Sequence, residues 1–127
     1  MGKGLGYLIG KLILGAVGYA VADAVTKNHT DRHIHEHVFA WYRRAHHEVT
    51  QWAQAQGNRK ALRILAEIDR AVTSVYNRVN MMLFAYSPNE QPVLIYEERV
   101  PLAELREQFG PGVKVGRVYD VTEAMLG

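Results

Sequence analysis

The sequence predicts a mainly α protein of the α+β class, built from three consecutive parts. Three observations predict it: a glycine-rich apolar N-terminus, two long segments with apolar residues at helical spacing, and a C-terminal segment that alternates strand and helix patterns. We therefore expect a glycine-rich hydrophobic helix over residues 1–27, an antiparallel two-helix hairpin over residues 28–86, and a small strand-helix-strand tail over residues 87–127.

Length and composition limit the classes of function. A chain of 127 residues has room for one domain plus an appendage. Fifteen Lys and Arg residues against thirteen Asp and Glu residues give a net charge of +2, and the basic residues are scattered. This excess is too small to predict a nucleic-acid partner. The absence of cysteine excludes disulfides, thiolate metal sites and a cysteine nucleophile.

The N-terminal stretch is almost free of charge and rich in very small residues. Between Gly4 and Val25 only Lys11 and Asp23 are charged. Small residues recur at a spacing of four in three short runs: Gly2, Gly6 and Gly10; Ala16, Ala20 and Ala24; and Gly18 with Ala22. Each glycine inside a helix costs about 1 kcal/mol relative to alanine. Close packing against another helix would compensate for that cost. The predicted oligomer or membrane contacts are Gly6, Gly10, Lys11, Leu14, Ala16, Gly18 and Ala20.

Three interpretations of this stretch remain open. Residues 4–25 are long enough for a membrane helix, which needs about 20 residues, although the longest uncharged run, 12–22, is too short by itself. A basic start, an apolar run and an A-x-A sequence at residues 20–22 also fit a secretory signal peptide. The third interpretation is a helix buried in the core of a soluble oligomer. The first and third both predict self-association through the glycine stripe.

The first helix of the hairpin is predicted from about Arg32 to Gln56. Its apolar residues recur at spacings of three and four, and Thr30 or Asp31 is the expected N-cap. Gly57 and Asn58 are expected to end the helix. The apolar face comprises Ile34, Val38, Trp41, Ala45, Val49 and Trp52. We expect its two tryptophans to lie in the core, and make no prediction for the position of Tyr42.

The second helix is predicted to begin near Arg59. Seven apolar residues then repeat at threes and fours: Leu62, Leu65, Ile68, Val72, Val75, Val79 and Met82. Two amphipathic helices joined by a short Gly-Asn turn predict an antiparallel hairpin. Residues 81–86 are apolar without a clean period, so they fit either a continuation of the helix or a strand.

The tail begins after a turn over residues 87–92, where two prolines exclude regular structure. A β-branched and aromatic run predicts a strand over residues 93–99. Pro101 is expected to open a short helix, which the glycines and proline at 110–112 end. A last strand is expected within residues 113–121, with Gly116 as a bulge. We expect the two strands to pair into a small sheet that packs on the hairpin or on another subunit.

All six histidines lie between His29 and His47. His29, His33 and His37 are spaced by four, so one helix would place them on one side, where neutral imidazoles bind divalent metals. The same cluster also fits solvated or interfacial surface histidines, or a switch that charges near pH 6. A divalent metal is therefore the one cofactor that the sequence suggests.

The sequence does not predict an enzyme, and no catalytic residue is assigned. His47-Glu48 begins an H-E-x-x-H pattern, but Gln51 stands where the second histidine is required. No G-x-S-x-G nucleophile motif occurs. Glu97 and Glu98 are adjacent on a predicted strand and should therefore point to opposite faces of it.

These observations predict a non-enzymatic, self-associating scaffold or anchor protein that is associated with a membrane. A toxin-like pore former that assembles through residues 1–27 is one form of this prediction. The alternative is a soluble metal-binding or pH-sensing helical module that uses the histidines of residues 29–47. Expected partners are further copies of the chain, membrane lipid and a larger protein complex.

Overall fold

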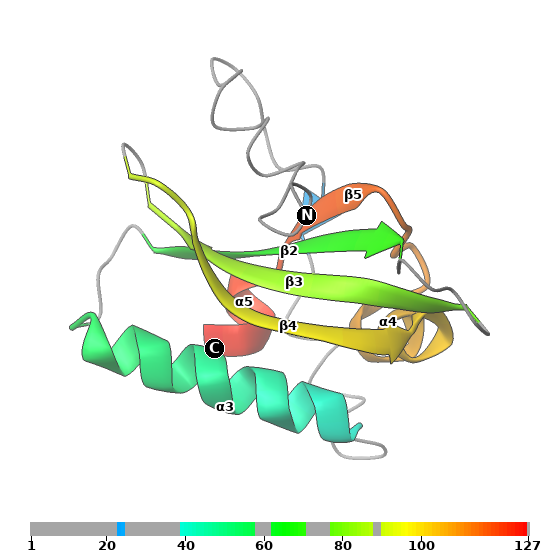
Figure 1. Cartoon of the computed structure of the whole chain (residues 1–127), viewed down its shortest axis with the longest axis horizontal. Helices are drawn as coiled ribbons and strands as arrows, with labels where there is room; N and C mark the ends of the chain where they lie inside the picture. The colour runs from blue at the N-terminus through cyan, green and yellow to red at the C-terminus, as the bar shows by residue number, and fades with distance from the viewer. Residues whose placement is uncertain (1–22, 25–38, 58–61, 71–76, 88–89, 127) are drawn as a thin grey trace.

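Residues 23–24, 39–57, 62–70, 77–87 and 90–126 are described by the structure, a computed structural model of the chain. The described part is a layer of antiparallel sheet with helices against one face (Figure 1). Its elements, in chain order, are β1 (Asp23–Ala24), α3 (Ala40–Ala55), β2 (Arg63–Arg70), β3 (Arg78–Tyr86), β4 (Val93–Pro101), α4 (Leu102–Phe109), β5 (Arg117–Asp120) and α5 (Thr122–Leu126).

The described strands form one five-stranded sheet in the order β1-β5-β2-β3-β4. Neighbouring strands from β5 to β4 are antiparallel, and the two-residue strand β1 pairs with β5 in parallel. The β3–β4 pair has a register shift near Leu83 and Phe84. The longest strands, β3 and β4, therefore lie next to each other at one side of the sheet.

The predicted mainly helical fold and its two-helix hairpin are wrong. The described residues of the second predicted helix lie in β2 and β3, which pair over eight positions from Arg63–Tyr86 to Arg70–Val79. Both strands are buried on both faces, so five consecutive residues of β2, from Ile64 to Ile68, are buried. A strand that is buried on both faces does not alternate between apolar and polar residues. The apolar residues chosen in the sequence therefore matched helical spacing by chance.

Helix α3 confirms the first predicted helix from residue 40 onward, and residues 32–38 lie outside the described part. Trp41, Ala45 and Val49 are buried in the core, and Trp52 packs against it half-buried. The helix ends as expected, because Gly57 adopts a left-handed φ of 76° and donates from its N–H to the Gln54 carbonyl. Its N-cap residue is Phe39 and not Thr30 or Asp31.

The tail elements β4, α4 and β5 are confirmed, but their arrangement differs from the prediction. β4 and β5 do not pair, because β2 and β3 lie between them in the sheet. Gly116 is not in a bulge: it precedes β5 with φ of 84° and donates from its N–H to the Ile68 carbonyl at 2.7 Å. Residues 81–86, which fitted either structure, are strand.

The main core fills the space between the helices and the sheet. Tyr42 and Val49 of α3, Leu105 and Phe109 of α4, and Met125 of α5 all join it. On the sheet side it contains Ile64, Ala66, Ile68, Val79, Met81, Leu83, Ala85, Val100 and Tyr119. Figure 1 shows α3 and α5 on the same side of the sheet. The described helices thus share one face, here called the first face.

Some predictions concern parts of the chain that the structure does not describe. The glycine-rich stretch, with Gly6, Gly10, Lys11, Leu14, Ala16, Gly18 and Ala20, lies outside the described residues, as do His29, His33 and His37. Within the described ranges, no helix combines the length and apolar composition that crossing a bilayer requires.

Candidate binding pocket between α3 and α5

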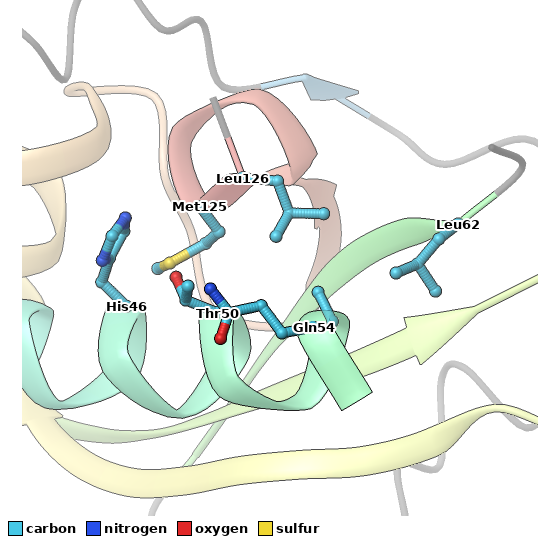
Figure 2. A pocket seen from close by; sticks show the side chains of 7 residues that line it. His46, Thr50, Gln54, Leu62, Met125 and Leu126 are labelled. Atoms are coloured by element: carbon cyan, nitrogen blue, oxygen red, sulfur yellow. The ribbon is translucent and has the colours of Figure 1, made fainter. Parts of the chain in front are cut away.

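A pocket of about 420 Å³ opens between α3 and the C-terminal helix α5 (Figure 2). It has an apolar part and a polar part. The apolar walls are Ala53, Leu62, Met125 and Leu126, and the polar side chains are those of His46, Thr50 and Gln54. The mixture resembles that of ligand and peptide sites, where apolar walls supply the contact and a few polar groups fix orientation.

The polar wall follows from the period of α3. His46, Thr50 and Gln54 are spaced by four along the helix, one position after the buried Ala45, Val49 and Ala53. Because residues four apart lie on the same side of a helix, they form one row beside the buried stripe. Figure 2 shows this row facing α5.

Helix α5 is held in place by hydrogen bonds at its start and at its middle. The Ile64 N–H of β2 donates to Thr122 Oγ1 at 2.8 Å, and the Thr122 N–H donates to Asp120 Oδ1 at 3.0 Å. From α3, the buried Tyr42 hydroxyl donates to the Ala124 carbonyl at 2.8 Å. These bonds fix the short helix against both α3 and β2, so the pocket has a defined shape.

One side chain of the pocket stands out by its exposure. Leu126 has 38% of its surface exposed, whereas its neighbour Met125 is fully buried. It is one of three large hydrophobic residues exposed in the described part of the chain; the others are Val93 and Val115. The pocket surface therefore carries an apolar cavity and an exposed apolar side chain next to each other.

A second cluster joins α3 to β4. The Arg44 Nε donates to Glu98 Oε1 at 3.2 Å and to the Tyr96 hydroxyl at 3.4 Å. A terminal nitrogen of Arg44 also pairs with Glu98, and the Tyr96 hydroxyl donates to the same carboxylate. Arg44 remains 55% exposed in its side chain and Glu98 23%. The three groups form a connection between the helix and the outermost long strand.

The cluster shifts the acid–base behaviour of its members. Partial burial and then the hydrogen bond to Glu98 raise the pKa of Tyr96. Partial burial alone would raise the pKa of Glu98, but the hydrogen bonds from Arg44 and Tyr96 outweigh it, and the pKa of Glu98 is lowered. The hydrogen bond to Glu98 raises the pKa of Arg44 further above its ordinary value. A tyrosine that is harder to ionise beside an ionised carboxylate suits an ion-pair contact better than proton transfer.

The predicted metal ligands His29, His33 and His37 lie outside the described residues, so metal binding by them stays a prediction. His46 and His47 are exposed on α3, and among the described residues no group of three or more His, Cys, Asp or Glu side chains is placed to hold a metal ion. Glu97 and Glu98 do point apart: Glu97 accepts a hydrogen bond from Asn80 at 2.7 Å on the sheet, and Glu98 binds Arg44 on α3.

Neither the pocket nor the Arg44 cluster has a local signal in the sequence. Both depend on contacts between residues more than fifty positions apart, such as Arg44 with Glu98 and Tyr42 with Ala124. Local periodicity predicts which side of α3 is buried, but it does not predict which later element covers that side.

Comparison of the chain with protein-family models, with curated proteins and with solved structures gave no match.

Proposed function

We propose that this chain is a non-enzymatic, self-associating scaffold protein, and that two copies meet through the surface around the α3–α5 pocket. The observation that carries the proposal is the position of the exposed Leu126 side chain beside an apolar cavity. A two-fold symmetric interface needs one patch that is complementary to itself. The exposed Leu126 side chain is itself a wall of the cavity, so the apolar patch of one copy can pack against the same patch of a second copy.

The composition of the pocket supports a protein partner. Apolar walls from Ala53, Leu62 and Met125 suit a leucine side chain, and burying such a side chain contributes about 1.5–3 kcal/mol. Thr50 and Gln54 lie at the same surface, where they can exchange hydrogen bonds with a backbone that approaches with that side chain.

The test is the mass of the full chain in solution, measured by sedimentation equilibrium. The wild-type protein is expected to sediment above its single-chain mass of 14.4 kDa. Leu126→Asp should return it to that mass, since it places a charge in the apolar patch that the partner would cover. Val115→Asp is the matched control, because Val115 is equally exposed, at 38%, but does not line the pocket.

A mixing experiment distinguishes association through this patch from a general loss of solubility or folding. Thr50→Arg places a charge in the pocket wall and should also give single chains. Mixed together, the Leu126→Asp and Thr50→Arg chains should associate in pairs, since the new aspartate of one meets the new arginine of the other. A wild-type protein that sediments as a single chain, or a mixture that stays dissociated, would contradict the proposal.

A further inference from the structure

The pocket between α3 and α5 carries one side chain whose charge changes near neutral pH. Among its seven described lining residues, only His46 has a titratable group. His46 begins the polar row that faces α5 in Figure 2, and it is exposed in the single chain. Water therefore solvates the imidazole there in both its neutral and its charged form.

On α3, the period of the helix decides which titratable groups share the side of His46. Tyr42 and Arg43 lie one turn earlier on that side, and the Tyr42 ring centroid is 6.0 Å from that of His46. Arg44, which binds Glu98 of β4, is two positions away and therefore on a different side of the helix. The cation that shares this side of α3 is thus Arg43, whose positive charge disfavours a proton on His46.

The other elements at the pocket add one residue of each charge. Arg63 begins β2, directly after a lining residue, and Glu123 is the only charged residue of α5. Neither of them lines the pocket, and its described lining contains no carboxylate. Covering the pocket would therefore remove water from His46 without bringing a lining carboxylate to its charged form.

We propose that protonation of His46 separates the associated copies, so that self-association weakens as the pH falls through the range in which histidines gain charge. The inference rests on the proposed function, in which two copies meet through the surface around this pocket. A partner there removes His46 from water, and burial disfavours the charged imidazolium. The neutral ring instead has one donor and one acceptor nitrogen to share with Thr50 or Gln54 of either copy.

The sign and the size of the effect follow from proton linkage. Associated copies hold fewer protons on His46 than single chains do, so association is strongest at high pH and is lost as the pH falls. A symmetric pair covers two His46 side chains. Complete exclusion of the charged form would weaken association up to about 100-fold for each pH unit below the range of the free imidazole. We expect a loss of at least about tenfold between about pH 7.5 and about pH 5.5.

Sedimentation equilibrium of the full chain at these two pH values, at one ionic strength, tests the inference. The measured quantity is the ratio of the two association constants, which should be about ten or more for the wild type. His46→Gln keeps a polar side chain without the titratable ring, and its ratio should be close to unity. His47→Gln is the matched control, because His47 is the next residue and is also exposed but does not line the pocket. Its ratio should equal that of the wild type.

The outcomes separate this inference from the proposed function. Both pH values lie above the ordinary glutamate pKa of 4.5 and thus above the lowered pKa of Glu98, so the pair with Arg44 stays intact. A wild-type ratio close to unity, with associated chains at both pH values, overturns the inference and leaves the association standing. Single chains at both values overturn both. A ratio that stays high in His46→Gln, or that falls equally in His47→Gln, assigns the effect to other charges and also overturns the inference. A high wild-type ratio that is lost only in His46→Gln supports it.

Imidazole signals in proton NMR spectra give a second measurement for the case that His46→Gln does not associate. The His46 signal is assigned by its absence from the spectrum of that variant. In the wild type it should take up its proton at a lower pH in a concentrated, associated sample than in a dilute one, whereas the His47 signal should titrate alike in both. Identical titrations of His46 at the two concentrations would contradict the inference.

Discussion

At the scale of single residues, Glu98 is a titratable group whose surroundings make stability depend on pH. Its pKa in the folded chain lies below the ordinary value of 4.5, chiefly because the bonds from Arg44 and Tyr96 outweigh the effect of partial burial. A lowered pKa means that the ionised carboxylate stabilises the fold above its unfolded-state pKa. This contribution is lost as the pH falls through the folded-state pKa.

We therefore expect the melting temperature to fall on acidification below about pH 4.5 and to fall less in Glu98→Gln. The measurement is a series of thermal melts from neutral to acidic pH. Glu107→Gln serves as the control, since Glu107 is an exposed carboxylate of α4. Identical acid profiles for wild type and Glu98→Gln would contradict the role given to the Arg44 pair.

Gln108 of α4 is a buried polar side chain, and its burial lowers the stability of the fold. It is 0% exposed, and within the described part of the chain neither its Nε2 nor its Oε1 has a hydrogen-bond partner. Gln108→Met keeps the length of the side chain and removes both polar atoms. We expect the free energy of unfolding, measured in urea, to rise by about 1 kcal/mol. The same change at the exposed Gln51 should have little effect, and a loss of stability in Gln108→Met would show that the amide is satisfied.

At the scale of elements, the turn into β5 depends on one glycine. Gly116 has a φ of 84°, and a Cβ added there would meet nothing within 4 Å, so any penalty is conformational and not steric crowding. Left-handed backbone costs an L-residue about 1–2 kcal/mol. Gly116→Ala should lower the free energy of unfolding by that amount. Gly112→Ala is the matched control, with equal space and no left-handed φ, and equal effects of the two changes would exclude this explanation.

The elements also show where sequence patterns succeed. β4, α4 and the end of α3 were predicted because their signals are local: β-branched and aromatic residues from Val93, a proline at position 101, and Gly57. β2 was missed because it is buried on both faces of the sheet. Every residue from Ile64 to Ile68 is therefore buried, whichever face its side chain points to. A strand buried on both faces carries no alternation, so its pattern alone does not separate it from a helix.

At the scale of the whole molecule, the candidate site was beyond local prediction. The pocket joins His46 of α3 to Leu126 at the other end of the chain, and the Arg44–Glu98 pair joins α3 to β4. Such contacts depend on the order of the strands in the sheet. The prediction of a helical hairpin left β2 and β3 out of the sheet, so it gave the wrong neighbours to β4 and β5. The expected core position of Trp41 was confirmed nonetheless, because the buried stripe of α3 follows from its period alone.

The sheet has a core on each face, and both should contribute to stability. The core on the face away from α3, here called the second face, comprises Leu65, Met82, Phe84 and Val118. Leu83→Ala removes a side chain from the first-face core and Phe84→Ala one from the second, and both residues are at most 2% exposed. Large-to-small changes at such sites cost about 2–5 kcal/mol. We expect both variants to lose stability within this range in urea denaturation. A nearly neutral Phe84→Ala would mean that the second face is not a packed core.

The parallel pairing of β1 with β5 places Asp23 beside Tyr119, nearly the whole chain apart. A ribosome adds about 5–20 residues per second from the N-terminus onward, so β1 emerges seconds before the strand that receives it. While β2, β3 and β4 assemble as neighbours, β1 has no place in the sheet. The first of the described strands to be synthesised is therefore among the last to join the sheet.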